Sequence, residues 1–192
     1  MLNNKAAIEL QAASSLGHAP GSAPAPVVQT EGLRVVEEPG LSVMSLRRSR
    51  IQADEAWLGT TLTALGLDVP AGPRQMSGDA QLACAQVEPH CWYLTGAEPV
   101  IDTAGEGWLV SDLSARFCIL RILGDAAADV LASGGNLKGL NVGMTLRLPF
   151  AESVNVLLQR FADDEFRLIV DVSFGPFVAE WLTDAASHPV PN

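Results

Sequence analysis

Apolar and polar residues alternate along several short stretches of the chain, which is the pattern of β-strands with two different faces. FRLIVDV, residues 166–172, alternates apolar residues with Arg167 and Asp171, which fall on the opposite side of the strand. Residues 116–123 begin with Arg116 and are otherwise apolar on both faces except for Arg121, so we expect a central strand there. LSVMSLRRSR, residues 41–50, also has strand character. These stretches predict a sheet protein.

Between the strands, apolar residues recur at helical spacing in three places. Each helix follows a side chain that can accept a hydrogen bond at a helix start, namely Asp54, Asp125 and Ser173. Gly66 and the glycine pair at 134–135 are suited to end the first two helices. The residues expected to face inward are Trp57, Leu58, Thr61, Leu62 and Leu65 in the first helix, Ala127, Val130 and Leu131 in the second, and Phe177, Trp181, Leu182 and Ala185 in the third.

The order of these elements indicates an α+β fold with a mainly antiparallel sheet and helices packed on it. Hairpins are predicted around residues 88–90 and 162–165, so a βαββ order occurs twice. We therefore expect one compact unit made of two pseudo-repeats, residues 31–110 and residues 111–192, with a helix at the end of the second. Residues 1–30 are expected to form an N-terminal extended arm.

The arm prediction rests on composition. Residues 11–30, QAASSLGHAPGSAPAPVVQT, contain three prolines and two glycines and keep neither a helical nor a strand period. Such a segment has too few large apolar residues to form a core of its own. We expect it to be flexible or extended in isolation and to dock on a partner.

The composition of the whole chain narrows the function classes. The chain has 192 residues, 48% of them hydrophobic, which is enough for a substantial core. It has 22 acidic and 12 basic residues and a net charge of −10, which argues against nucleic acid and anionic membranes as partners. The sequence has no uncharged apolar run of about 18 residues and no recognisable signal peptide. Three cysteines form no disulfide framework, so we expect reduced thiols and a cytoplasmic protein.

The sequence offers little for catalysis. Cys84 and Cys91 could face each other across the first hairpin, but with Cys118 elsewhere the spacing fits no zinc site. His90 lies in a predicted turn, and no nucleophile or carboxylate stands at a recognisable spacing from it. Neither a phosphate-binding glycine loop nor a nucleophile elbow occurs. We predict no catalytic, cofactor-binding or metal-binding residue, and a binding or scaffold subunit.

Two arginines are the candidates for contact with a partner. Arg116 begins a strand that is otherwise apolar and Arg121 lies within it. At a margin of the sheet, either guanidinium could meet an acidic group of another chain. The alternative is a salt bridge within the chain, for instance to Asp112 or Asp129. The sequence leaves both interpretations open.

The order of residues from Trp108 to Gly143, WLVSDLSARFCILRILGDAAADVLASGGNLKGLNVG, is distinctive. Asp-x-Ser-x-Arg enters a strand, and Gly-x-x-Ala-x-x-Val-Leu-Ala follows. These positions are Asp112, Ser114, Arg116, Gly124, Ala127, Val130, Leu131 and Ala132. With PHCWYLTG, VNVLLQRF and FRLIVDVSFGPFVAEWLTDAA, they make most of residues 31–187 resemble the gamma subunit of heterotetrameric sarcosine oxidase.

The resemblance also shows departures. His90 and Cys91 stand where the family usually has an acidic pair, and residues 147–153 stand where many relatives have a Gln-Thr pair. The C-terminal ending HPVPN is short and rich in proline. These departures leave the N-methyl amine substrate of the parent complex open.

What the resemblance implies is a fold like the folate-binding domain of glycine-cleavage aminomethyltransferase. It implies a complex whose beta subunit binds flavin and oxidises sarcosine to glycine, and whose alpha subunit binds NAD and receives the one-carbon unit on tetrahydrofolate. FAD, FMN, NAD and tetrahydrofolate would then be cofactors of the parent complex and not of this chain. The chain would pack against the larger subunits, chiefly the alpha subunit, and act in assembly and stability.

Two other functions stay open at this point. The first is a stand-alone folate-binding protein with the same fold, which would need a pocket carboxylate or arginine placed for the pterin ring. The second is an unrelated enzyme whose site the sequence does not reveal.

Overall fold

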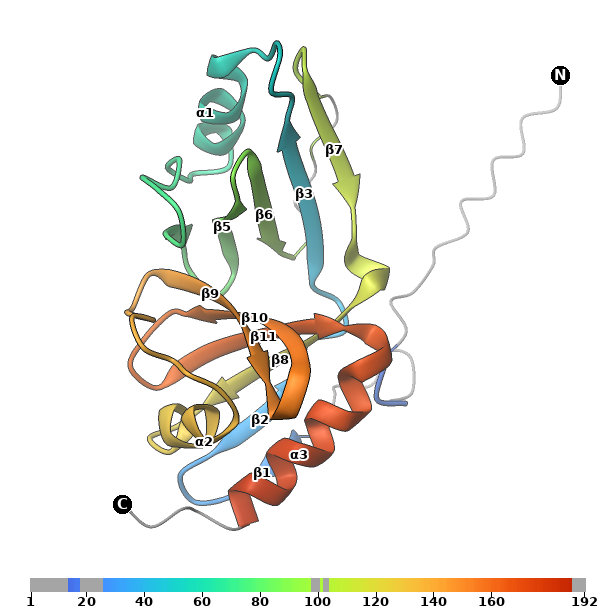
Figure 1. Ribbon diagram of the computed structural model, residues 1–192, viewed down its shortest axis with the longest axis vertical. Helices are drawn as coiled ribbons and strands as arrows, with labels where there is room; N and C mark the ends of the chain where they lie inside the picture. Colours follow the sequence, from blue (N-terminus) through green and yellow to red (C-terminus); the bar gives the residue numbers. More distant parts are fainter. Residues whose placement is uncertain (1–13, 18–25, 98–100, 102–103, 188–192) are drawn as a thin grey trace, which may run out of the picture.

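The computed structural model describes residues 14–17, 26–97, 101 and 104–187. Two antiparallel sheets lie face to face, and helices cover the outer face of each sheet (Figure 1). The α+β class and the antiparallel pairing predicted from the sequence are confirmed.

The five-stranded sheet has the order β4-β5-β6-β3-β7. Its strands are β3 (Ser42–Arg48), β4 (Met76–Gly78), β5 (Leu82–Glu88), β6 (Cys91–Gly96) and β7 (Trp108–Asp112). Helix α1 (Glu55–Ala64) packs on its outer face, where Leu58 and Leu62 join three of the four tryptophans. The ring centroid of Trp108 lies 4.9 Å from that of Trp57 and 5.5 Å from that of Trp92. This aromatic cluster holds α1 against the sheet.

The six-stranded sheet has the order β1-β2-β8-β11-β10-β9. Its strands are β1 (Pro26–Gln29), β2 (Arg34–Glu37), β8 (Phe117–Leu123), β9 (Met144–Phe150), β10 (Val154–Arg160) and β11 (Glu165–Asp171). Helices α2 (Ala127–Gly134) and α3 (Gly175–Ser187) cover its outer face over the largest apolar cluster of the protein. Short 3-10 helices, η1 (Ser114–Arg116), η2 (Ala151–Ser153) and η3 (Val172–Phe174), connect the elements.

The predicted first half contributes strands to both sheets. Strand β2, from the predicted half 31–110, lies in the six-stranded sheet with the strands of the other half. Strand β7 closes the edge of the five-stranded sheet, next to β3. The sheets are also joined by backbone hydrogen bonds, from Thr145 N to Arg74 O at 2.7 Å and from Met76 N to Gly143 O at 3.0 Å. The duplication of a βαββ unit stays a prediction.

The N-terminal region differs from the predicted arm of residues 1–30. Residues 26–29 form strand β1, which pairs with β2, so the ordered part begins before the expected boundary near Glu31. Residues 14–17 lie against the domain, where Ser15 donates hydrogen bonds from N and Oγ to Oε1 of the buried Glu37 at 2.8 and 2.7 Å. Residues 1–13 and 18–25 of the predicted arm lie outside the described residues.

Of the three predicted helix starts, only the first is confirmed. Asp54 accepts a hydrogen bond from Ala56 N at 2.9 Å and caps α1. Helix α2 begins after Ala126, without a side-chain cap, so the prediction for Asp125 is wrong. The prediction for Ser173 is also wrong, because η3 occupies that position and α3 begins at Gly175.

The intervening turn η3 also changes which face of α3 is buried. The buried residues of α3 are Gly175, Val178, Ala179 and Leu182, whereas Phe177 is 42% exposed. The expectation that Phe177 faces inward is therefore wrong. Trp181 lies at the margin of the core, edge-on to the Phe150 ring at 4.8 Å between centroids.

Candidate functional site

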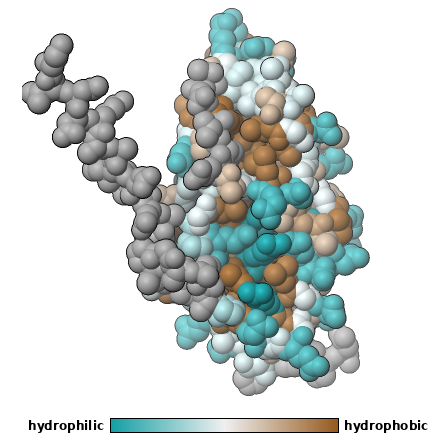
Figure 2. Space-filling model, turned by 180° about the vertical axis from the view of Figure 1, so that it is seen from behind, coloured by the Kyte–Doolittle hydropathy of each residue, from teal (hydrophilic) through white to brown (hydrophobic). Residues whose placement is uncertain are grey.

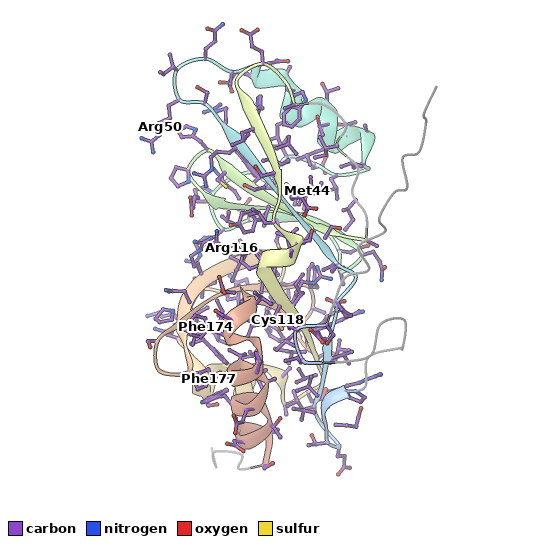
Figure 3. All side chains as sticks on the ribbon, turned by 90° about the vertical axis from the view of Figure 1, so that its right-hand side faces the viewer. Met44, Arg50, Arg116, Cys118, Phe174 and Phe177 are labelled. Carbon is purple, nitrogen blue, oxygen red and sulfur yellow. The ribbon has the colours of Figure 1, made fainter. Side chains whose placement is uncertain are left out.

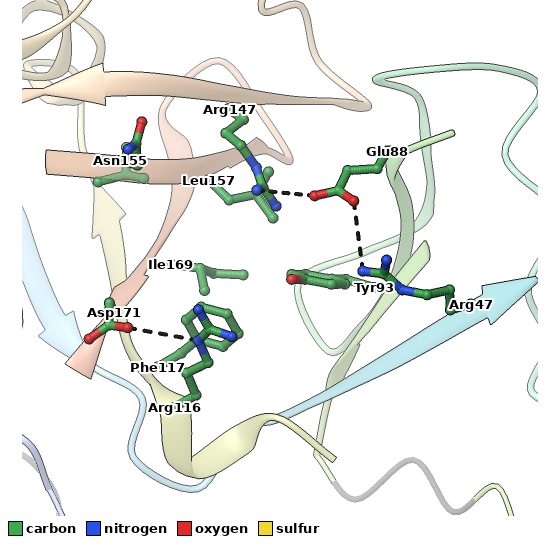
Figure 4. A pocket seen from close by; sticks show the side chains of 11 residues that line it. Arg47, Glu88, Tyr93, Arg116, Phe117, Arg147, Asn155, Leu157, Ile169 and Asp171 are labelled. Atoms are coloured by element: carbon green, nitrogen blue, oxygen red, sulfur yellow. Dashed lines mark ion pairs between the residues drawn. The ribbon is translucent and has the colours of Figure 1, made fainter. Parts of the chain in front are cut away.

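The space between the two sheets holds the main candidate site. An apolar part of this layer contains Val43, Ile119, Leu157 and Ile169. Beside it lies a cavity of about 280 Å³, the inter-sheet cavity, lined from both sheets (Figure 4). Its lining residues are Arg47, Glu88, Tyr93, Arg116, Phe117, Arg147, Asn155, Val156, Leu157, Ile169 and Asp171.

Three arginines line the inter-sheet cavity, and each forms a loose ion pair there. Arg47 and Arg147 both face Glu88, with nitrogen–oxygen distances of 3.7 and 3.3 Å. Arg116 lies 3.8 Å from Asp171 on the other side of the cavity (Figure 4). Within the described part of the chain these guanidiniums make no hydrogen bond, since the three ion pairs are longer or less well aligned than hydrogen bonds are.

The carboxylate of Asp171 is held in its charged form by its neighbours. The hydroxyl and backbone N–H of Ser173 donate hydrogen bonds to Asp171 Oδ1 at 2.7 and 3.1 Å, and these bonds lower the pKa of Asp171. The charge of Arg116 lowers it further by a smaller amount. Three guanidiniums and two carboxylates therefore line the cavity, which leaves one net positive charge in a chain of net charge −10.

A second polar group lies deeper between the sheets. Arg167 of β11 is fully buried and donates from Nε to Glu38 Oε2 at 2.9 Å and from Nη2 to the carbonyl of Ala80 at 2.6 Å. Its guanidinium also lies over the Phe161 ring, 5.0 Å from the centroid. Glu38 comes directly after strand β2 of the six-stranded sheet, and Ala80 comes just before strand β5 of the five-stranded sheet. Arg167 therefore ties the two sheets together.

Two donors of this buried group have no partner among the described residues. They are Nη1 of Arg167 and Nε2 of the fully buried Gln159. Gln159 and Arg167 are register partners in β10 and β11, so the two groups are neighbours. Sequence reasoning missed both residues, although a polar position in each of two neighbouring apolar strands is a signal of a polar layer.

The two arginines predicted at a partner interface both form ion pairs within the chain. Arg121 donates from Nε to Glu165 Oε1 at 2.9 Å, and Arg116 pairs with Asp171. Salt bridges within the chain, the alternative interpretation, are therefore present, but their partners are Asp171 and Glu165 and not Asp112 or Asp129. Arg121 is largely occupied by its pair, whereas two thirds of the Arg116 side chain is exposed, at 66%. A role of either residue at an interface stays a prediction.

The cysteines are buried and free. Burial raises the pKa of Cys84 to about 12 and the pKa of Cys118 to about 11, so both are neutral thiols near neutral pH. Cys84 pairs in register with Leu94 and not with Cys91, so the expectation that the two cysteines face each other is wrong. Burial makes these thiols poor nucleophiles.

The predicted turn histidine is confirmed as such. His90 lies in the β5–β6 turn, and its Nδ1 is 2.9 Å from Nη2 of Arg48. Among the described residues no three His, Cys, Asp or Glu side chains are grouped so as to hold a metal ion. A search of the same residues for a helix long and apolar enough to cross a membrane also found none.

An exposed apolar patch lies where β11 leads into α3. It consists of Val172, Phe174 and Phe177, which are 39%, 47% and 42% exposed. Phe174 and Phe177 lie on the same side of the molecule as Arg116 (Figure 3). We call Val172, Phe174 and Phe177 the α3 patch.

The surface seen from behind the view of Figure 1 has brown hydrophobic areas that hydrophilic groups interrupt (Figure 2).

The fold is similar to that of part of a solved aminomethyltransferase. The chain is similar to the glycine cleavage system aminomethyltransferase T from Bartonella henselae, with a TM-score of 0.53 and 14% identity. The match covers 79% of this chain and 45% of that chain, so this chain spans about half of the aminomethyltransferase. The fold implied by the sequence resemblance is therefore confirmed.

A more similar structure belongs to a multisubunit oxidase. The chain matches one chain of the heterotetrameric sarcosine oxidase from Corynebacterium sp. U-96, in complex with pyrrole 2-carboxylate, with a TM-score of 0.70 and 22% identity. The match covers 87% of this chain and 90% of that chain. Neither the family models nor the curated proteins contain a match. The resemblance to sarcosine oxidase is confirmed as a likeness of fold.

Proposed function

We propose that this chain is a non-catalytic subunit, corresponding to the gamma subunit, of a heterotetrameric sarcosine oxidase and that it acts in assembly and stability of the complex. The observation that carries the proposal is the likeness over nearly the full length of both chains, 87% of this one and 90% of the other. A match of this extent covers most of both chains and is not limited to a short shared segment.

In the proposed complex the chemistry belongs to the larger subunits. They would oxidise sarcosine to glycine and pass the one-carbon unit to tetrahydrofolate, using FAD, FMN and NAD, in the cytoplasm. The described residues of this chain support such a division. Cys84 and Cys118 have raised pKa values and are protonated thiols, which are poor nucleophiles. The ring of His90 contacts Arg48 in a turn, and within the described residues it makes no hydrogen bond to a nucleophile.

The α3 patch supports a role in assembly. Exposed large apolar side chains that gather at one place mark protein–protein contacts in soluble proteins, and aromatic residues are enriched in such contacts. Phe174 of η3 and Phe177 in the first turn of α3 are partly exposed, and the buried face of α3 is filled by Val178 and Leu182. The exposed part of the patch is therefore available for contact with a larger subunit.

Co-expression with the larger subunits of a sarcosine oxidase encoded in the same genome tests the proposal. We expect the chain to co-purify with them as one species in size-exclusion chromatography. Phe174→Ser and Phe177→Ser should reduce the yield of complex at least tenfold. Ile51→Ser is the matched control, because Ile51 is 98% exposed and lies outside the α3 patch.

The isolated chain provides the second half of the test. We expect it to retain no flavin and to show no oxidase activity with sarcosine or other secondary amines. Micromolar binding of a tetrahydrofolate analogue to the isolated chain, without assembly, would instead support the stand-alone folate-binding protein. The inter-sheet cavity, at about 280 Å³, is just below the ~300–1,000 Å³ range of sites for drug-sized ligands, which favours an occupant smaller than a folate.

A further inference from the structure

We propose that the inter-sheet cavity binds a single carboxylate group carried on an apolar body. The cavity brings Arg47 from β3, Arg147 from β9 and Arg116 from η1 to the same space. A guanidinium has five N–H donors in a planar fork that matches the two oxygens of a carboxylate.

The donors of the cavity arginines are open to solvent, since 56% of the Arg47 side chain, 46% of Arg147 and 66% of Arg116 are exposed. Arg121 and Arg167 make hydrogen bonds of 2.9 Å to carboxylates of the chain, through Nε in each case. The cavity arginines instead hold Glu88 and Asp171 at 3.3–3.8 Å without a hydrogen bond inside the described chain. Arginines that line a cavity without aligned partners keep their forks available to a ligand.

The charge of the lining favours one negative charge on the ligand. Three guanidiniums face two carboxylates, so a single carboxylate neutralises the cavity. The chain has a net charge of −10 overall, so its long-range field repels anions, and the positive charge is local to the cavity. A phosphate dianion would leave the cavity negative, which makes a carboxylate the better fit.

The remaining walls favour an apolar body behind the carboxylate. The rings of Tyr93 and Phe117 lie 6.1 Å apart between centroids and are tilted by 51°. The aliphatic side chains of Leu157 and Ile169 complete this wall (Figure 4). A ligand that places its carboxylate among the arginines can therefore bury an apolar part against these rings and methyl groups.

Two sources can supply this chemistry. One is a free, small carboxylic acid. The other is an Asp or Glu side chain of a larger subunit, flanked by apolar residues, and this source rests on the proposed function. Arg116 connects the cavity to the α3 patch, since its partner Asp171 immediately precedes Val172. The shared chemistry is the same in both cases, so the experiment has one arm for each source.

The first arm titrates the isolated full-length chain with benzoate by isothermal calorimetry at low ionic strength. Benzamide is the uncharged probe of the same shape, and inorganic phosphate is the anion without an apolar body. We expect saturable binding of benzoate, with benzamide and phosphate at least tenfold weaker. Arg116→Gln and Arg147→Gln should each weaken benzoate at least tenfold, while Arg50→Gln, an exposed arginine outside the cavity, should not.

The second arm measures co-assembly of the same variants with the larger subunits. If benzoate does not bind but Arg116→Gln and Arg147→Gln reduce the yield of complex and Arg50→Gln does not, the carboxylate comes from the partner. Equal binding of benzoate and benzamide overturns the proposal. So does the absence of benzoate binding together with unchanged assembly of the variants. Benzoate binding by a wild-type chain that joins no complex supports the cavity site and contradicts the proposed function.

Discussion

The two faces of β11 bury different chemistry. Phe166, Leu168 and Val170 face α2 and α3 and join the largest apolar cluster. On the other face Ile169 meets the second sheet, with Arg167 and Asp171 on either side of it along the strand. The helix-covered face is continuous and apolar, whereas the inter-sheet face holds a buried ion pair and the arginine-lined cavity.

The two faces of this sheet therefore differ in what they contribute: the helix-covered face contributes stability, and the inter-sheet face contributes directional polar groups. Apolar burial on the helix side stabilises the fold without specifying a ligand, because it is roughly proportional to area and has no direction. Buried polar groups are directional and costly unless they are paired. The proposed carboxylate site lies in the layer where these polar groups gather, between the sheets.

The largest effect is expected from removing the buried arginine. Arg167→Ala leaves the partly buried Glu38 without its partner, and breaking a buried pair in this way costs about 3–5 kcal/mol of unfolding free energy. Urea denaturation measures the loss. Arg167→Met with Glu38→Gln is the matched control, because it removes both charges, and we expect it to cost less than Arg167→Ala. Equal stability of Arg167→Ala and the wild type would show that the pair contributes nothing.

The next largest effects are expected from truncating one aliphatic side chain on each face of β11. Leu168→Ala should cost about 2–5 kcal/mol, the range for a large aliphatic side chain in a closed core. Ile169→Ala should cost less, because Ile169 borders the inter-sheet cavity and its neighbours can relax into that space. The comparison uses urea denaturation of both variants. A larger loss for Ile169→Ala would contradict the view that the helix-covered face carries the stability.

Trp181→Ala measures how the margin of the helix-covered face contributes. Trp181 is half-buried and packs edge-on against Phe150. We expect a loss of about 2–3 kcal/mol, below the ~3–5 kcal/mol of a fully buried aromatic residue. The shift of the thermal midpoint checks it, and Phe177→Ala is the matched control because Phe177 is exposed. A thermal midpoint unchanged by Trp181→Ala would show that the helix is not held there.

The smallest effects are expected in the pH dependence of the unfolding free energy. Its acid limb reports on aspartates near the inter-sheet layer, and its alkaline limb reports on cysteines of the helix-covered faces. The lowered pKa values of Asp79 and Asp171 stabilise the fold above their ordinary value of 3.8, and this contribution is lost as the pH falls below it. The raised pKa values of Cys84 and Cys118, on the helix-covered faces, stabilise the fold below 9.0, and this contribution is lost as the pH rises towards about 11 to 12.

Unfolding free energy measured across this pH range tests both assignments. Asp171→Asn should flatten the acid limb, and Cys84→Ala should flatten the alkaline limb. Each variant serves as the control for the other, because it leaves the opposite limb unchanged. A Cys84→Ala variant with the wild-type alkaline slope would contradict the assignment of that limb.

Much of the secondary structure could be predicted, because alternation and turn residues are local signals. The β10–β11 hairpin and the Asp54 cap are examples. The burial of Arg167 could not be predicted, since alternation separates two faces but does not say what covers the polar one. The exposure of Phe177 could not be predicted either, because the short 3-10 helix η3 before α3 changes which residues of α3 face the core.

The candidate site was harder to predict than the fold. Arg47 and Arg147 are far apart in sequence and meet only because the two sheets pack face to face. Arg116 was identified from its place beside an apolar strand, but its partner Asp171 comes from β11. No local pattern contains such pairings, whereas the likeness of fold to sarcosine oxidase could be anticipated from residues 108–143.

The central claim is that this chain is a subunit and not an enzyme by itself. Native mass spectrometry of the chain co-expressed with the larger subunits tests it most directly. We predict a complex that contains this 20.3 kDa chain once per set of larger subunits, with all flavin in the complex and none on the free chain. A free chain that carries flavin at full occupancy, or larger subunits that assemble without it, would contradict the claim.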